Sequence, residues 1–157
     1  MTRATDRKLA YGIFRITLGV NLLIHGAGRI FGPGARAFAA KTAGEFSGTP
    51  LPHSLVYLFL MVLTFAEAIL GGLIVLGLLT RWALTLGGLL IGALVLGTAL
   101  RSDWNTVGVQ MIYAITYYLL LKNLGDDYFS LDRLIWGEAK TTASVKQRQG
   151  RTGKLGC

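Results

Sequence analysis

The sequence predicts an all-α membrane protein, built as an antiparallel bundle of four transmembrane helices. Three observations predict this class: an apolar composition, four long apolar runs, and an uneven distribution of basic residues along the chain. The 157-residue chain is 52% hydrophobic and only 15% charged, whereas soluble domains carry about 25% charged residues. Disordered chains are polar and charge-rich, so the composition favours a chain that lies in a lipid bilayer.

The four apolar runs predict the four membrane-spanning helices. They cover residues 9–31, 54–80, 82–100 and 104–124. A helix needs about 20 mostly apolar residues to cross the hydrocarbon core. The strands of a membrane barrel would instead be alternating segments of about 10 residues, and the sequence contains no such pattern. The first run is too long for a signal peptide and lacks a small-residue cleavage site, so we expect it to be retained.

The segments between the runs complete the predicted organisation. Residues 1–8 form a cytoplasmic N-terminus, residues 9–136 the membrane domain, and residues 137–157 a disordered basic cytoplasmic tail. In the first loop, a weakly amphipathic stretch from Arg36 to Phe46 predicts a short interfacial helix that caps the outer mouth of the bundle. The connection at Thr80 and Arg81 is short enough to force a helical hairpin. Near the end, Ser130 is placed to N-cap a short helix.

The basic residues predict the orientation of the helices. The chain has 16 Lys and Arg against 8 Asp and Glu, a formal charge of +8. With both termini inside the cell, most of these cations lie on the cytoplasmic side, as the positive-inside rule requires. Only Arg36, Lys41 and Arg101 lie clearly outside, with Arg29 near that edge. The orientation accounts for the charge without nucleic acid, and we expect a multi-pass membrane protein.

Cysteine and histidine usage excludes several kinds of site. Cys157 is the only cysteine, so an intramolecular disulfide and a thiolate metal site are excluded. His25 and His53 are the only histidines, and they are too few for a multi-histidine metal cluster. We therefore predict neither a metal nor a haem.

Two ionisable residues inside the apolar runs are the main candidates for chemistry. Glu67 lies near the middle of its run and Arg15 lies within the first run. A charge at the bilayer centre costs about 2.5–3.5 kcal/mol on insertion scales, so such residues are paired, face a polar cavity, or serve function. From their depths, Arg15 could reach Glu67. The pair could be a lock between helices, or part of a site that binds or protonates a small ligand, and the sequence leaves both interpretations open.

Other polar residues recur at helical spacing and predict inward-facing stripes. If these stripes converge, the bundle encloses a polar-lined pocket that widens toward its outer half. His25 is either bonded to Glu67 or Gln110, or exchanges protons. We predict catalytic roles for Glu67, Arg15 and His25. The predicted ligand-binding residues are Asn21, Arg29, Gln110, Tyr113 and Tyr117.

Glycines predict close helix packing. Gly71, Gly72 and Gly77 lie in the second run, and Gly88 and Gly92 form a GxxxG pattern in the third. The third run has few polar groups, so we expect it to pack against other helices or to meet another subunit.

An ordered set of residues carries a family resemblance. The set is Arg15, Gly19, His25, Gly26, Arg29, Phe31, Gly32, Glu67, Gly71, Gly72, Gly77 to Arg81 and Tyr128 to Asp132. It resembles the pattern of the DoxX family of small prokaryotic membrane proteins. The resemblance covers roughly residues 9–135, while the tail beyond Gly137 lies outside the family pattern. At position 29 such sequences commonly have lysine, and arginine keeps the charge.

The resemblance implies a four-helix membrane subunit, and we therefore expect a multi-pass protein of the prokaryotic cytoplasmic (inner) membrane. DoxX relatives are described as DoxD-like subunits of thiosulfate:quinone oxidoreductase or as parts of membrane oxidoreductase complexes. We therefore expect an oxidoreductase subunit that interacts with a quinone, with electrons supplied by a partner protein or directly by the substrate. The alternative is a non-catalytic scaffold, anchor or assembly factor, and a transporter is a weaker third hypothesis. The expected partners are the bilayer, a protein subunit or a second copy, and anionic lipid at the C-terminal tail.

Overall fold

The computed structural model describes residues 3–135, and these residues fold into helices joined by short connections, without strands. The helices are α1 (Arg3–Phe31), α2 (Ala35–Gly44), α3 (His53–Leu76), α4 (Thr80–Leu100) and α5 (Trp104–Lys122), followed by the 3-10 turn η1 (Leu124–Asp126). Residues 131–135 are also helical. The predicted tail, residues 137–157, lies outside the described residues.

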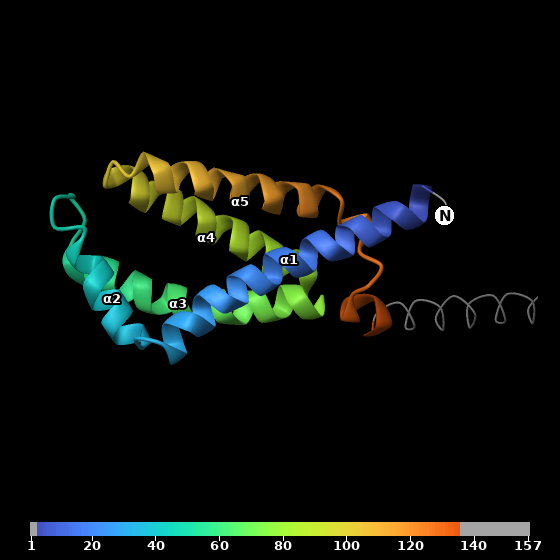
Figure 1. Cartoon of the computed structure of the whole chain (residues 1–157), viewed down its shortest axis with the longest axis horizontal. Helices are drawn as coiled ribbons and strands as arrows, with labels where there is room; N and C mark the ends of the chain where they lie inside the picture. The colour runs from blue at the N-terminus through green and yellow to red at the C-terminus, as the bar shows by residue number, and fades with distance from the viewer. Residues whose placement is uncertain (1–2, 136–157) are drawn as a thin grey trace, which may run out of the picture.

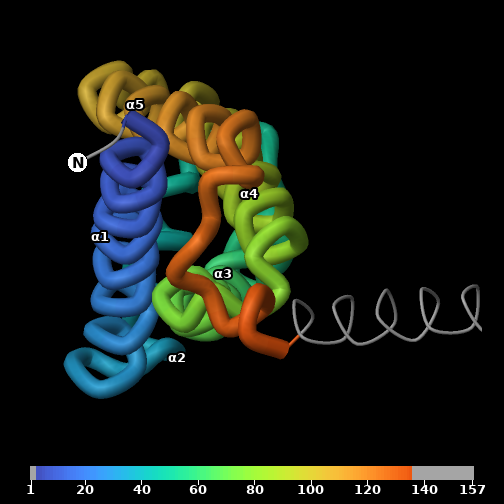
Figure 2. Tube along the Cα trace, turned by 90° about the vertical axis from the view of Figure 1, so that its right-hand side faces the viewer, coloured from blue at the N-terminus to red at the C-terminus, as the bar shows by residue number. Residues whose placement is uncertain are grey.

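The long helices run antiparallel to their neighbours in the order α1, α3, α4, α5 (Figures 1 and 2). α2 and the α4–α5 connection lie at one end of the molecule, which we call the α2 end. The N-terminus of α1, the α3–α4 turn and the segment after α5 lie at the other, which we call the N-terminal end (Figure 1). The chain thus carries its polar connections at two opposite ends.

Among the described residues, α1, α3 and α4 are long and apolar enough to cross a membrane. All-helical structure and membrane-type helices are therefore confirmed. α5 forms where the fourth span was predicted, but it is not among the helices that meet this criterion. Polar residues such as Asn105, Thr106 and Gln110 lower its hydropathy.

The helix boundaries differ from the predicted ones for local reasons. α1 begins at Arg3 rather than at residue 9, because polar residues of high helix propensity extend it beyond the apolar run. α3 ends at Leu76 rather than at residue 80. Gly77 adopts a left-handed conformation (φ 66°), and Leu78 N–H donates to the Leu73 carbonyl oxygen. This is a Schellman ending, which the apolar run conceals.

Glycines set the closest helix contact, between α1 and α3. A Cβ on Gly26 would fall 2.3 Å from the Ala68 nitrogen, and one on Gly71 would fall 2.3 Å from the Leu23 nitrogen. The predicted role of Gly71 is thus confirmed, whereas a Cβ on Gly72 would meet nothing within 4 Å. In α4, Gly87 packs on Tyr117, but Gly92 is exposed, so the Gly88–Gly92 pattern is not a packing motif within the chain.

The predicted short helix of the first loop is confirmed as α2. Its residues Ala39 and Ala43 are buried, together with Phe46 beyond its end. They form an apolar cluster with Val56, Leu60 and Leu63 of α3. These apolar contacts fix α2 against the first turns of α3.

Candidate functional site

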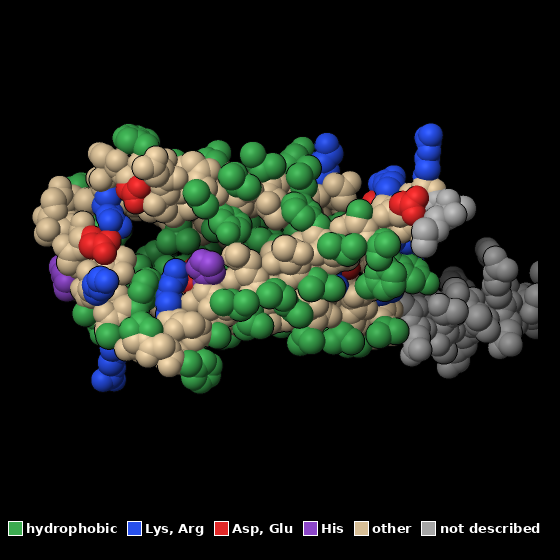
Figure 3. Space-filling model, viewed as in Figure 1, with side chains coloured by type: hydrophobic (Ala, Val, Ile, Leu, Met, Phe, Trp, Pro, Cys, Tyr) green, Lys and Arg blue, Asp and Glu red, His purple; other side chains and the backbone are tan. Residues whose placement is uncertain are grey.

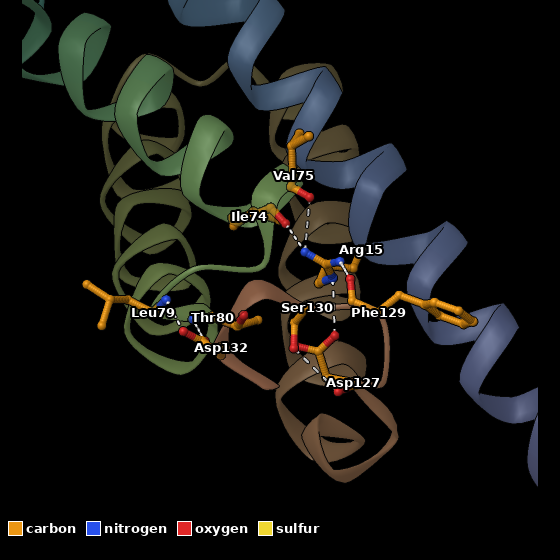
Figure 4. Close-up of polar contacts among 9 residues, drawn as sticks. All are labelled: Arg15, Ile74, Val75, Leu79, Thr80, Asp127, Phe129, Ser130 and Asp132. Carbon is orange, nitrogen blue, oxygen red and sulfur yellow. Dashed lines mark hydrogen bonds and ion pairs between the residues drawn. The ribbon is translucent and has the colours of Figure 1, made fainter. Parts of the chain in front are cut away.

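Arg15 is buried at the N-terminal end, where it binds the end of α3. Its side chain donates from Nη1 to the Ile74 carbonyl oxygen and, at 3.2 Å, to that of Val75. Nη2 donates to the Phe129 carbonyl oxygen at 2.8 Å, and Nε lies 3.4 Å from the Asp127 carboxylate (Figure 4). A cation is favoured at these carbonyls, because the C-terminus of a helix carries partial negative charge.

The predicted pair between Arg15 and Glu67 is therefore wrong. Gly26 packs against Ala68 and Gly19 against Val75, and this antiparallel register places Arg15 beyond the last turn of α3. The Arg15 partner Ile74 lies seven residues from Glu67, or about 10 Å at 1.5 Å per residue. Sequence-based depths misplaced the pair because they were counted from the ends of the two apolar runs, as if those ends lay at the same level. The glycine contacts instead shift α1 along α3, so that Arg15 lies near the end of α3 and Glu67 does not.

The segment after α5 completes the cluster around Arg15. The Asp132 carboxylate accepts hydrogen bonds from Leu79 N–H (2.8 Å) and Thr80 N–H (2.7 Å), the first amides of α4. Asp132 N–H in turn donates to the Gly77 carbonyl oxygen at 3.0 Å. Leu79 adopts a left-handed backbone (φ 49°), which these bonds hold in place. The arrangement clamps the α3–α4 turn (Figure 4).

Asp127 is the carboxylate that faces Arg15 in this cluster, which we call the N-terminal cluster. Burial raises the pKa of its carboxyl group, while the Arg15 guanidinium and the hydroxyl groups of Ser130 and Thr80 oppose the rise. Ser130 precedes the helical segment that begins at residue 131, as predicted, and its hydroxyl group faces the Asp127 carbonyl oxygen at 3.5 Å. All these contacts hold chain segments together, so the cluster is structural in its geometry.

Glu67 lies in a second polar cluster, near the α2 end, where it forms an ion pair with Arg29. The Glu67 side chain is 4% exposed and that of Arg29 is 23% exposed. The Arg29 guanidinium also stacks on the Phe38 ring of α2, 4.3 Å from its centroid. Arg29 therefore connects the carboxylate of α3 to the helix that covers this end.

His25 lies beside this pair but is not hydrogen-bonded to it. Its Nδ1 lies 3.0 Å from the Asn21 carbonyl oxygen, one turn back in α1. The ring is exposed and close enough to interact electrostatically with Glu67. The predicted hydrogen bonds from His25 to Glu67 or Gln110 are therefore absent.

The remaining predicted site residues lie in different places. Gln110 is buried and accepts a hydrogen bond from the Thr98 hydroxyl group at 2.7 Å, which joins α5 to α4. Tyr117 is buried against Gly87, and its hydroxyl group interacts electrostatically with Glu67 and Tyr113. Asn21 is half-buried and contributes its carbonyl oxygen to His25. Of the predicted ligand-binding set, Arg29 alone lines the cavity described next.

A cavity of about 440 Å³ lies at the α2 end, between α2, α3 and α4. Its walls are mostly apolar and include Leu55, Phe59, Leu60, Leu63 and Leu94. Arg29, Arg101, Thr98 and Thr106 supply its main polar groups. Figure 3 shows one face of the molecule hollowed near this end, with hydrophobic side chains inside the hollow and basic ones at its edge. Ligand sites commonly have this size and mixture of walls.

Arg29 and Arg101 of the cavity have the same kind of surroundings, a carboxylate and a phenylalanine ring. Arg101 pairs with Glu45 at 2.7 Å and stacks on Phe46, 5.1 Å from its ring centroid, as Arg29 pairs with Glu67 and stacks on Phe38. A guanidinium has five N–H donors and no acceptor. Each arginine directs one terminal nitrogen to its carboxylate, which leaves further donors for an oxygen acceptor in the cavity.

The polar-lined pocket predicted to hold both Arg15 and Glu67 is absent from the described structure. An apolar core that includes Leu18, Leu22, Leu70 and Ile74 lies between the two polar clusters. The cavity does lie near the α2 end, but its walls are apolar rather than polar. The residues Phe38, Phe46, Thr98 and Arg101 were not predicted as site residues, because neither their spacing nor their hydropathy distinguishes them from packing or loop residues.

The comparisons identify the family of the chain. No curated protein and no solved structure matches it. A model of the DoxX family matches residues 10–99, a stretch that includes Arg15, Arg29, Glu67 and most of the cavity wall. This match covers more than half of the chain. The chain therefore belongs to the DoxX family of membrane proteins.

Proposed function

We propose that this DoxX protein is an integral membrane subunit of an oxidoreductase complex and binds a quinone in the cavity at the α2 end. One observation carries the proposal: an apolar cavity of about 440 Å³ is bordered by two guanidinium groups, one of them paired with a buried carboxylate. A quinone is a flat apolar ring with two carbonyl acceptors. Its ring suits the leucine and phenylalanine walls, and its carbonyl oxygens suit the arginine donors.

The same cavity has titratable groups at its border. Arg29 lines it and pairs with Glu67, and His25 lies within electrostatic reach of Glu67. Reduction of a quinone to a quinol takes up two electrons and two protons. Glu67 and His25 are the groups that we propose to exchange those protons, while a partner protein supplies the electrons. Arg15 has no part in this proposal, because its donors are used at the other end.

The proposal includes a membrane arrangement. α5 is the fourth span, although it is less apolar than α1, α3 and α4. It carries Gln110 and Tyr117 toward neighbouring helices, and a span that packs within a bundle tolerates polar residues better than one that faces lipid. In a prokaryotic inner membrane, both termini lie on the cytoplasmic side, because this orientation places most Lys and Arg residues inside the cell. The α2 end and its cavity then face outward.

The structure also favours a second candidate function, a non-catalytic scaffold or assembly factor. Arg15, Asp127 and Asp132 are engaged in contacts that fix the α3–α4 turn and the segment after α5. A protein that only presents a rigid surface to a partner needs such a clamp and needs no quinone. The two candidates differ in whether the cavity binds a ligand.

Quinone binding by the purified protein tests the proposal. Lipids extracted from the protein are analysed for quinones by mass spectrometry, and a quinone with a decyl tail is titrated into protein held in nanodiscs. Gly97→Phe fills the cavity, since Gly97 lines it and a Cβ there meets Phe46 at an ordinary 3.7 Å. Gly92→Phe is the matched control on the same helix, because Gly92 is exposed and a Cβ there meets nothing within 4 Å.

We expect wild type and Gly92→Phe to bind the quinone alike, and Gly97→Phe to bind at least tenfold more weakly while it elutes as a folded protein. Equal binding by both variants would refute the cavity as the site. Absence of quinone from the extract, together with no binding in the titration, would favour the scaffold.

A further inference from the structure

A second concave site lies at the opposite end of the molecule, between α1 and α5. This groove has a volume of about 670 Å³. Ala10, Ile13 and Phe14 of α1 form one wall, and Leu119 and Leu120 of α5 belong to the other. It shares no lining residue with the quinone cavity, so its occupant is a separate question.

The groove has one polar end and an apolar body. Arg7, Asn123 and Asp126 line it at the N-terminal end. Along α1, one to two turns further from that end, Ile13 is 59% exposed and Phe14 is 39% exposed. An occupant that matches this surface has a polar head beside Arg7 and an apolar chain that follows α1.

The charge at the polar end favours an anionic head. The Arg7 side chain is 68% exposed and uses Nη2 to bind Asp126 at 2.7 Å, which leaves other guanidinium donors for a second acceptor. Lys8 and Arg133 lie over the Tyr128 ring, 4.6 Å and 4.3 Å from its centroid. Cations with an aromatic ring are typical of the headgroup layer of a membrane, and arginine binds phosphate strongly.

We propose that the α1–α5 groove binds an anionic phospholipid, with its phosphate at Arg7 and one acyl chain along Ala10, Ile13 and Phe14. Basic pockets between membrane helices bind anionic headgroups through the same chemistry. The lipid fills the space where α1 and α5 diverge, and it holds the N-terminal part of α1 against α5. The site does not depend on quinone binding at the other end.

Native mass spectrometry of the purified protein tests this site. Phosphatidylglycerol and phosphatidylcholine with the same acyl chains are titrated separately into wild type and four variants. Arg7→Gln removes the headgroup donor, and Arg3→Gln is its control, because Arg3 is an exposed cation of the same helix that does not line the groove. Ala10→Trp fills the groove, and Leu9→Trp is its control on an exposed neighbouring position outside it.

We expect wild type and both control variants to bind phosphatidylglycerol at least tenfold more tightly than phosphatidylcholine. Arg7→Gln should lose that preference, and Ala10→Trp should lose the bound lipid. Equal affinity of wild type for the two lipids would overturn the proposal, as would unchanged binding in Ala10→Trp. A competition experiment in Gly97→Phe, whose cavity at the α2 end is filled, gives a further test. If a decyl quinone displaces phosphatidylglycerol from this variant, the groove is a quinone site and the proposal is overturned.

Discussion

Arg15 and Arg29, both on α1, show how one residue type serves two ends of a membrane protein. Arg15 donates to backbone carbonyl oxygens of Ile74 and Phe129 and lies near the Asp127 carboxylate. Arg29 pairs with the Glu67 carboxylate. Both avoid lipid, as buried cations must. Only Arg29 also lines a cavity. The geometry around each arginine, rather than its charge, therefore distinguishes a structural contact from a candidate binding contact.

At this scale the Arg29–Glu67 pair gives a direct prediction. Arg29→Gln should destabilise the protein more than Glu67→Gln, because it leaves the more buried partner unpaired. The double variant should be less destabilised than the sum of the two, with a coupling of about 0.5–3 kcal/mol, the range for residues in contact. The free energies of unfolding of the four proteins in this double-mutant cycle are measured in mixed micelles. Additive losses would show that the two side chains do not interact.

The long helices were predictable as elements, because each apolar run is a strong and continuous signal. Their pairing was not. The register between α1 and α3 depends on the close backbone contacts at Gly19, Gly26 and Gly71, and the sequence does not reveal which of its many glycines make such contacts. The same register decides that Glu67 pairs with Arg29 and not with Arg15. Site prediction failed where it required helix register.

The glycine contacts give a prediction for the α1–α3 interface. Gly26→Ala should destabilise the fold by about 1–3 kcal/mol, the usual cost of overpacking, because its Cβ would meet the Ala68 backbone at 2.3 Å. Gly28→Ala is the matched control two residues away, where a Cβ meets nothing within 4 Å. Thermal unfolding followed by size-exclusion chromatography compares the two. Equal melting temperatures would contradict the observed register.

The start of α5 gives a prediction about pH. Hydrogen bonds from the Thr106 hydroxyl group and its backbone N–H lower the pKa of Asp103, the N-cap of α5. A lowered folded-state pKa means that the cap contributes fully above the unfolded pKa of about 3.9 and is lost as the pH falls through the folded value. Protection of the Thr106 amide from hydrogen exchange, measured relative to its intrinsic exchange rate at each pH, should therefore fall in acid. In Asp103→Asn, which caps without titrating, this loss of protection should disappear, and its persistence would refute the account.

At the scale of the whole molecule, the chain divides its polar groups between two ends and fills the middle with apolar side chains. The N-terminal cluster joins α1, α3, α4 and the segment after α5. The cluster at the α2 end borders a cavity. The sequence predicted buried ionisable groups and a covering helix, which the structure contains. It could not predict this separation, because the Arg15 partners Asp127 and Phe129 lie far from Arg15 along the chain.

This division predicts that stability and ligand binding respond to different substitutions. Arg15→Gln should lower the free energy of unfolding by about 3–5 kcal/mol, as expected when a buried charge network loses a member. The fraction that remains folded should bind a decyl quinone with wild-type affinity. Arg81→Gln, at an exposed cation near the same end, should change neither quantity. If Arg15→Gln is as stable as wild type but no longer binds the quinone, Arg15 contributes to the binding site and the division is contradicted.

The location of a bound quinone tests the central claim most directly. A quinone with a photoreactive group on its ring is bound to the protein in nanodiscs, illuminated, and mapped by peptide mass spectrometry. We predict labels on the cavity walls, at residues 55–63 of α3 and 94–101 at the end of α4, and their loss in Gly97→Phe. Labels confined to residues 7–17 and 119–126 of the α1–α5 groove would contradict the account.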